Sequence, residues 1–134
     1  MKISSKGRYA VRLMVEIATS NKECVSLSEI AEKQNLTIKY LEQIVSKLVK
    51  ANLLISSRGA QGGYKLAKPA NKCTIAEILA VTNDLPEFAP CLKGNKKCDM
   101  KNKCTTIGCW ETLSNLICNF LQKITLQDLI DKNY

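Results

Sequence analysis

A glycine-rich segment directly follows two closely spaced amphipathic helices, and this order restricts the possible folds to a small number. Residues 57–63 read Ser-Arg-Gly-Ala-Gln-Gly-Gly and separate two short apolar runs, residues 53–56 and 64–67. Short apolar runs on either side of a glycine-containing turn predict a β-hairpin. Helices followed by such a hairpin indicate a winged helix. We therefore expect a mainly α fold with a small β-hairpin wing.

Three helices are predicted ahead of the hairpin. The first covers residues 5–20, the second opens at Ser26 and the third opens at Thr37. Ser26 stands three residues before Glu29, the spacing of a capping box. A short helix, a tight turn and a second helix form the helix-turn-helix arrangement. The apolar positions that recur at helical spacing are Ala10, Leu13, Met14, Ile17, Leu27, Ile30, Ala31, Ile38, Leu41, Ile44, Val45 and Leu48.

The polar face of the third helix is the candidate DNA-reading surface. Lys39, Glu42 and Gln43 lie on the side opposite its apolar residues, near the N-terminal end of the helix. In a helix-turn-helix, side chains at that end contact base edges in the major groove. For an isolated helix the same pattern would indicate only a solvated face, so the hairpin that follows decides in favour of DNA binding.

The tip of the hairpin carries one arginine, Arg58. An arginine suits a narrow and electronegative minor groove, and glycines let a backbone come close to another surface. A glycine-rich turn by itself is usually only a turn, but its place after the third helix predicts a DNA-contacting wing. The expected contact residues of this wing are Arg58, Gly59, Gly62 and Gly63.

The net charge is +8, and its distribution matters more than its size. Residues 1–72 contain 13 Lys or Arg against five acids, whereas residues 73–134 contain seven of each sign. A basic N-terminal half predicts a polyanionic partner, and a lysine-rich solvated surface is the alternative. Together with the helix-turn-helix pattern, the charge predicts double-stranded DNA as the partner.

The chain contains no histidine, which removes the usual general base, so we expect no enzyme. No run of 18 apolar residues is present, and Lys6, Arg8 and Arg12 interrupt the N-terminal segment where a signal peptide would need an apolar region. These features predict a cytoplasmic protein without a membrane segment.

Cys91, Cys98 and Cys104 are separated by six and five residues in a segment rich in lysine. Thiolates gathered on a short irregular segment can converge on one metal centre, whereas cysteines that fill a core are scattered along apolar stripes. The segment therefore predicts a metal or cluster site, and it leaves open an iron–sulfur cluster, a redox-silent zinc site and a reactive thiol centre. The remaining cysteines Cys24, Cys73 and Cys118 are predicted to be buried structural residues.

A long helix is predicted from residue 105 onward, with a short final helix that Thr125 caps. A small winged-helix domain cannot cover so long an apolar stripe, so a second copy of the same helix is the expected partner in a homodimer. We divide the chain into a DNA-binding domain (1–82), a cysteine-containing loop (83–104) and a dimerisation region (105–134). The apolar stripe contains Ile107, Trp110, Leu113, Ile117, Phe120, Leu121 and Ile124.

Several motifs resemble one family of bacterial repressors. They are SKGRYA from residue 5, YLEQIVSKL from residue 40, SRGAQGGY from residue 57, and the three-cysteine loop. These motifs resemble the winged-helix family that contains IscR, NsrR and CymR, and they are most similar to its iron–sulfur cluster regulators of the IscR type. The likeness spans nearly the whole chain.

The resemblance implies roles for individual residues. It implies a homodimeric repressor in which Lys39, Glu42 and Gln43 enter the major groove and Arg58 enters the minor groove. Glu42 would discriminate between operator classes according to cluster occupancy. The resemblance implies phosphate contacts, which position a protein without reading sequence, for Ser5, Arg8 and Tyr40.

The cysteine loop departs from the IscR pattern in two ways. IscR-like proteins have five residues between the first two cysteines, where this chain has six. They have a histidine three residues after the third cysteine, where this chain has Ile107. The fourth ligand therefore stays open between Cys109, a group from the partner subunit as in NsrR, and a small exogenous ligand. A 2Fe-2S cluster is preferred on the likeness to IscR, and a 4Fe-4S cluster is also compatible with three thiolates.

The function that these features predict is a cluster-sensing, DNA-binding repressor. Its expected targets are genes for iron–sulfur cluster assembly, for iron or sulfur metabolism, or for the response to redox or nitric oxide stress. Two alternatives stay open: a CymR-like regulator of cysteine metabolism without a cluster, and a zinc or thiol-redox protein with secondary DNA binding.

Overall fold

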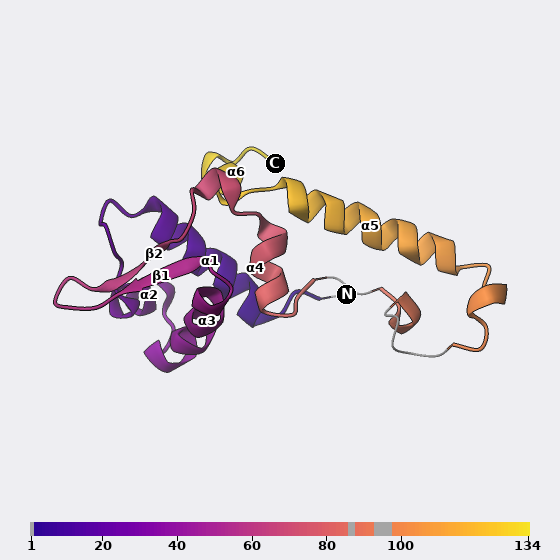
Figure 1. The fold of residues 1–134 in the computed structure, drawn as a ribbon, viewed down its shortest axis with the longest axis horizontal. Coiled ribbons are helices and arrows are strands. Elements are labelled where there is room, and N and C mark those ends of the chain that lie inside the picture. Colours follow the sequence, from indigo (N-terminus) through magenta and orange to yellow (C-terminus); the bar gives the residue numbers. More distant parts are fainter. Residues whose placement is uncertain (1, 86–87, 93–97) are drawn as a thin grey trace.

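A computed structural model describes residues 2–85, 88–92 and 98–134 (Figure 1). Residues 86–87 and 93–97 of the expected cysteine loop lie outside the described residues. The α-helices are α1 (Ser5–Thr19), α2 (Leu27–Gln34), α3 (Ile38–Lys50), α4 (Ile75–Val81), α5 (Ile107–Lys123) and α6 (Leu126–Asp131). The strands are β1 (Leu54–Ser57) and β2 (Gly63–Leu66), and 3-10 turns cover Ala70–Lys72, Pro90–Leu92 and Lys101–Lys103.

The structure confirms the mainly α fold with a two-stranded wing. β1 and β2 are antiparallel, with Leu54 opposite Leu66 and Ser57 opposite Gly63. β1 begins and ends one residue later than expected, and β2 begins and ends one residue earlier. The difference arises at the tip, where Gly63 pairs across the sheet instead of belonging to the turn.

Short-range capping signals set the start of the helices. Ser26, Thr37, Thr74 and Thr125 each accept a hydrogen bond from the backbone N–H three residues later. The capping boxes of α4 and α6 are complete, but the one expected at α2 is not. Glu29 pairs with Lys22 at 2.7 Å and with Lys33 at 3.5 Å, so its carboxylate serves ion pairs instead of the N-cap amide.

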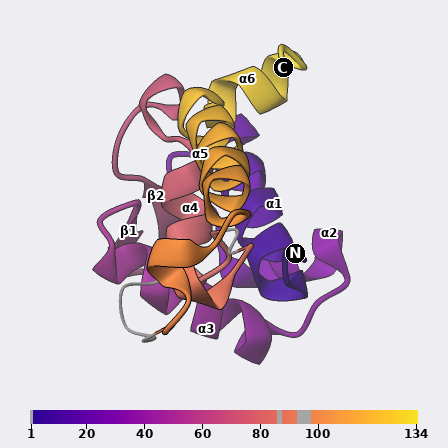
Figure 2. The ribbon, with the colours of Figure 1, turned by 90° about the vertical axis from the view of Figure 1, so that its right-hand side faces the viewer.

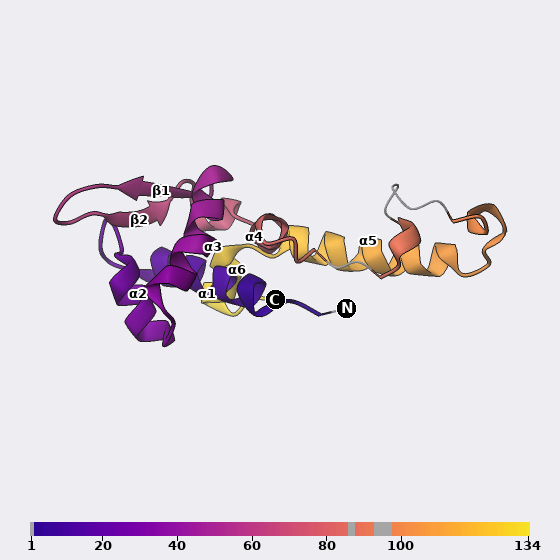
Figure 3. The same ribbon diagram turned by 90° about the horizontal axis from the view of Figure 1, so that it is seen from below.

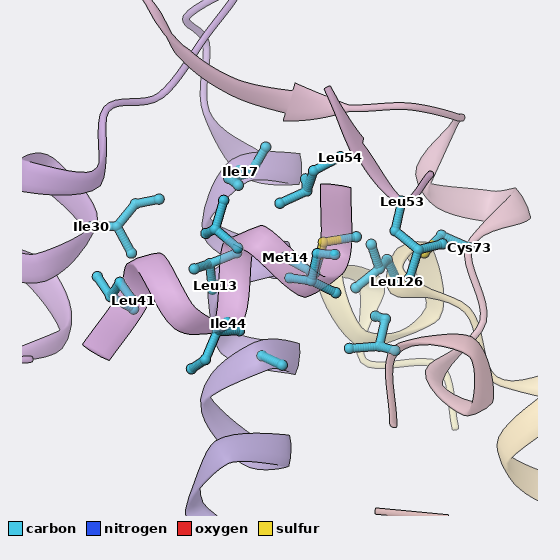
Figure 4. Close-up of a cluster of buried hydrophobic side chains, with 14 of the residues drawn as sticks. Leu13, Met14, Ile17, Ile30, Leu41, Ile44, Leu53, Leu54, Cys73 and Leu126 are labelled. Atoms are coloured by element: carbon cyan, nitrogen blue, oxygen red, sulfur yellow. The ribbon is translucent and has the colours of Figure 1, made fainter. Parts of the chain in front are cut away.

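The core gathers around the apolar face of α1. Ala10, Leu13 and Met14 on this face have no exposed surface, and Ile17 is buried one turn further on. Figure 4 shows these side chains meeting those of α2, α3, β1 and α6. Because α1 also packs against α4 and β2, one helix holds the helix-turn-helix, the wing and the C-terminal helix together.

A pair of backbone hydrogen bonds joins the start of α4 to the turn between α5 and α6. Ile75 N–H donates to the Ile124 carbonyl and Leu126 N–H donates to the Cys73 carbonyl, both at 2.9 Å. Leu126 has no exposed surface. This joint anchors the C-terminal end of α5 to the domain that contains α1–α4.

The rest of α5 projects away from the other helices (Figures 1 and 3). No residue of α5 is buried. Figure 2 views the molecule nearly along the axis of α5, with the N-terminal end of α5 toward the viewer and α4 and α1 behind it. The wing and the turns at Pro90–Leu92 and Lys101–Lys103 therefore lie at opposite ends of the molecule (Figures 1 and 3), while the three-part division of the chain stays a prediction.

None of the helices in the described ranges has the length and apolar character that a membrane span requires.

Candidate functional site

The exposed face of α3 carries the residues predicted to read bases. Lys39, Glu42 and Gln43 are all exposed, while Leu41 and Ile44 on the other face have no exposed surface. Within the described part of the chain, Glu42 forms no ion pair. The helix is thus held by its apolar face, and its polar face is free to contact a ligand as large as DNA.

Tyr40 differs from these residues because it is half-buried. Its ring meets that of Tyr9 edge to face, with ring centroids 6.0 Å apart, and the guanidinium of Arg12 lies 5.6 Å from the centroid of Tyr9. Such contacts stabilise by about 0.5–1.5 kcal/mol each. Tyr9 and Arg12 therefore help to fix the N-terminal end of α3 against α1. Our sequence analysis missed this role, although their spacing of three residues places both on one face of α1.

The first turn of α1 presents two of the predicted phosphate contacts. Arg8 and Ser5 are exposed, and Arg8 Nη2 donates to Ser5 Oγ at 3.2 Å. The hydroxyl therefore orients the guanidinium at the N-terminal end of α1, where helix N–H groups favour an anion.

The wing glycines have different roles. Gly59, with φ +112°, has nothing within 4 Å of the position that a Cβ would occupy, so its backbone can come close to another molecule. A Cβ on Gly62 would lie 2.5 Å from the Ser57 carbonyl oxygen, and Gly62 N–H closes the turn on the Gly59 carbonyl at 2.9 Å. Gly62 is therefore required by the turn itself.

Gly63 allows the linker between α1 and α2 to pair with the wing. Val25 and Tyr64 exchange two backbone hydrogen bonds of 2.9 and 2.8 Å, and a Cβ on Gly63 would lie 2.3 Å from the Val25 carbonyl oxygen. This pairing fixes the base of the wing against the helix-turn-helix. Exposed Arg58 is held at the other end of the hairpin.

The structure does not bring the candidate ligands of the cysteine segment together. Cys91 lies half-buried in the Pro90–Leu92 turn, Cys98 is exposed, and Cys104 follows the Lys101–Lys103 turn. Cys109 is exposed in the first turn of α5. Over residues 2–85, 88–92 and 98–134, no three Cys, Asp or Glu side chains form a group able to hold a metal ion.

The chemistry of the donors nevertheless fits iron. Hydrogen bonds from the hydroxyl and backbone N–H of Thr106, together with the N–H of Ile107, lower the pKa of Cys104 below its ordinary value. The Sγ of Cys104 and the Oγ1 of Thr106 are 3.4 Å apart. A thiol that ionises more readily is a better ligand for a soft metal.

The three cysteines predicted to be structural fall into two groups. Cys73 is buried, and burial raises the pKa of its thiol to about 11. The prediction that Cys73 is a buried structural residue is confirmed, because a protonated and enclosed thiol behaves as a small apolar side chain. Cys24 and Cys118 are half-buried, so they are less enclosed than we expected.

Comparison with known proteins identifies the family. The profile of the Rrf2 family, described as iron-dependent transcriptional regulator, matches residues 3–132. This chain belongs to the Rrf2 family. The HTH-type transcriptional regulator IscR of Vibrio vulnificus is 40% identical to this Rrf2 regulator over 134 residues, which cover 99% of this chain and 79% of that protein. Because such relatives are named as transcriptional regulators, they confirm the expectation that the chain is not an enzyme.

Two solved structures resemble this Rrf2 regulator over its whole length. CymR, the global cysteine regulator of B. subtilis, has a TM-score of 0.78 and 32% identity, with 100% of this chain and 99% of that chain covered. T. potens IscR has a TM-score of 0.77 and 36% identity, with 100% and 89% covered. The winged-helix fold and the family resemblance are therefore confirmed. The protein is a transcriptional regulator similar to IscR.

The two wing glycines give a first prediction. We expect Gly63→Ala to lower the free energy of unfolding by about 2–4 kcal/mol, because the Cβ meets the Val25 backbone. We expect Gly59→Ala to cost only about 1 kcal/mol of stability, because no protein atom lies near the added Cβ. The same Cβ should weaken DNA binding, because it would keep the backbone of the wing tip away from the DNA. Urea unfolding and fluorescence anisotropy with labelled DNA measure the two effects. Equal losses of stability in both variants would contradict this assignment.

The pKa of Cys73 gives a second prediction. At pH 8 only about 0.1% of a thiol with a pKa of about 11 is ionised, and only the thiolate reacts. In the folded, metal-free protein we expect iodoacetamide to modify Cys73 at least about 100-fold more slowly than exposed Cys98. Mass spectrometry of proteolytic peptides measures the rates, with urea-unfolded protein as the control. Similar rates in the folded protein would show that Cys73 is accessible.

Proposed function

We propose that this Rrf2 regulator is a repressor whose DNA binding depends on an iron–sulfur cluster. It would control genes for iron–sulfur cluster assembly, for iron or sulfur metabolism, or for the response to redox or nitric oxide stress. The observation that carries the proposal is the position of Cys91, Cys98 and Cys104. They lie in the segment that leads from the winged-helix domain to α5. A ligand held by these cysteines would act on the connection between the winged-helix domain and α5.

The donor set supports a site for a soft metal. Cys91, Cys98 and Cys104 would hold the group, and the lowered pKa of Cys104 favours the ligand form. The cluster, when bound, supplies a centre that is gained or lost with iron supply and oxidants. We favour a 2Fe-2S cluster because of the likeness to IscR, and the fourth ligand stays open between Cys109, the partner subunit and an exogenous group.

The proposed partner is a double-stranded DNA operator. Exposed Lys39, Glu42 and Gln43 would enter the major groove, and Arg58 at the wing tip would enter the minor groove. Ser5, Arg8 and Tyr40 would contact phosphates and so set the register of the protein on DNA. The rigid contacts of α3 and the wing with α1 support this assignment, because they hold both reading elements in one orientation.

We further propose that the regulator acts as a homodimer through α5. Trp110, Leu116 and Phe120 have 40%, 63% and 55% of their surface exposed. An apolar pocket of about 330 Å³ lies at the C-terminal end of α5, where Phe120 and Leu121 meet Val11 of α1 and Leu79 of α4. An exposed apolar helix next to an apolar pocket supports a second copy of the chain as the occupant.

A second candidate is a cluster-free regulator of the CymR type. The TM-score of 0.78 with CymR supports it, since the fold alone does not require a cluster. The three cysteines distinguish the candidates, because a cluster-free regulator needs no thiolate triplet. A zinc site would also use the triplet, but it would leave the protein colourless.

Replacement of the three cysteines tests the cluster. We expect anaerobically purified wild-type protein to be brown and to contain iron and acid-labile sulfide. The Cys91→Ala, Cys98→Ala, Cys104→Ala variant should contain neither, and its affinity for at least one operator should differ from that of loaded wild type by about 10-fold or more. Visible absorption, metal analysis and anisotropy measure these properties.

A matched control uses cysteines outside the segment. We expect the Cys24→Ala, Cys118→Ala variant to keep both its colour and its operator affinity. Colourless wild-type protein with one zinc per chain, even after anaerobic reconstitution, would refute cluster sensing and leave a structural zinc site. Operator binding that is the same with and without a bound cluster would favour the CymR-type alternative.

Charge placed on α5 tests the dimer. We expect Leu116→Glu with Phe120→Glu to raise the dimer dissociation constant by about 100-fold or more, because each carboxylate would have to be desolvated in an apolar interface. Sedimentation equilibrium measures the constant. Asn115→Glu is the control, since at about 100° per residue it lies away from Leu116 and Phe120. An unchanged constant in the double variant would exclude this face as the interface.

A further inference from the structure

A carboxylate at the root of the cysteine segment holds the N-terminus of α1. Ser4 N–H donates to Asp84 Oδ1 at 2.8 Å, and Ser4 Oγ donates to Asp84 Oδ2 at 2.7 Å. The two residues are 80 positions apart in the chain. Ser4 is also the N-cap of α1, because its Oγ accepts a hydrogen bond from Gly7 N–H at 3.1 Å. We call these contacts the Ser4–Asp84 clasp.

The clasp is tightly packed. Gly7 is buried, and a Cβ at this position would lie 2.6 Å from Asp84 Oδ2. The carboxylate therefore lies directly against the first turn of α1, where free N–H groups favour a negative charge. Partial burial alone would raise the pKa of Asp84, but the hydrogen bonds that its carboxylate accepts from Ser4 contribute to the opposite effect, and the pKa lies below its ordinary value.

Asp84 occupies the position where the cysteine segment leaves the domain. α4 ends at Val81, and Asn83 adopts a left-handed conformation with φ +59°. The Asp84 N–H then donates a hydrogen bond of 2.9 Å to the Leu79 carbonyl. The chain then continues toward Cys91. A change in the direction of the segment would therefore alter the position of Asp84 and its contacts with Ser4.

The other side of the clasp is the predicted DNA-contacting surface. Ser5 follows Ser4 directly, and Arg8 lies one turn further along α1. In the described part of the chain, no hydrogen bond other than those of the clasp joins α1 or its N-cap to residues from 84 onward. The second anchor of the segment, between Cys73 and Leu126, joins α4 to α6 and does not involve α1.

We infer that Asp84 is a positioning residue that couples the cysteine segment to the first turn of α1. The inference rests on the proposed function, because the signal is the gain or loss of a cluster at Cys91, Cys98 and Cys104. Reorganisation of the segment would displace the Asp84 carboxylate and, through Ser4, the hydroxyl of Ser5 and the guanidinium of Arg8. DNA affinity would then change although Asp84 itself touches no DNA.

The experiment compares operator affinity with and without a cluster in the full chain. If wild-type affinity changes by about 10-fold or more on anaerobic reconstitution, we expect the change in Asp84→Asn to fall within about twofold. Asn has nearly the same shape, but it lacks the charge and one of the two acceptor oxygens. Ser4→Ala removes only the hydroxyl bond, so it should give an intermediate change and also serves if Asp84→Asn folds poorly.

Asp128→Asn is the matched control. Asp128 Oδ2 accepts from Thr125 N–H at 2.8 Å and from Thr125 Oγ1 at 2.6 Å, which is the same chemistry at the start of α6. This variant should keep the wild-type change in affinity. Hydrogen exchange provides a second readout: reconstitution should alter the exchange of the Gly7 and Arg8 amides in wild type but not in Asp84→Asn.

The outcomes separate the clasp from the proposed function. A wild-type change that persists in Asp84→Asn would overturn the clasp and leave cluster sensing intact. An equal loss of affinity in both states would also overturn it, because it would show a merely structural role. An absence of any change in the cluster-loaded wild type would overturn cluster sensing itself, and the coupling with it.

Discussion

Burial of one face of α1 is the constraint on which the rest of the structure depends. The face formed by Ala10, Leu13, Met14 and Ile17 meets α3, α4, α6 and β2. Side chains of the size of Leu13, Met14 and Ile17 each contribute about 1.5–3 kcal/mol when fully buried. The elements that pack on this face are therefore held in place through α1. Because α1 also presents Arg8 on its exposed side, the core and the proposed DNA-binding surface share one helix.

The two ends of the molecule differ in what stabilises them. The helix-turn-helix and wing are complete within one chain, since Val25 pairs with Tyr64 and Tyr9 packs on Tyr40. α5 contributes no buried residue over its length and keeps an apolar side exposed. A winged-helix head with a projecting helix is therefore suited to respond to events in the connecting segment. The winged-helix domain stays folded by its own contacts, whereas the direction of α5 is set by its anchor at the start of α4.

Much of the fold was predictable because its signals are local. Ser26, Thr37 and Thr125 were predicted to start helices and do so, since a cap depends on residues only three positions away. The prediction of a capping box at α2 was wrong, because the Glu29 carboxylate forms ion pairs with Lys22 and Lys33. The separate roles of Gly59, Gly62 and Gly63 could not be predicted, because they depend on what lies beside each Cα.

The winged-helix class, the basic N-terminal half and the three cysteines on one segment could all be predicted without a structure. Periodicity, charge and cysteine spacing are properties of neighbouring residues, and they survive without knowledge of distant contacts. Only the tertiary structure decided which distant groups meet: Val25 with Tyr64, Cys73 with Leu126, and Ser4 with Asp84. A hydrogen bond between residues 80 positions apart leaves no local pattern, because it forms only after the core has placed α1 and α4 side by side.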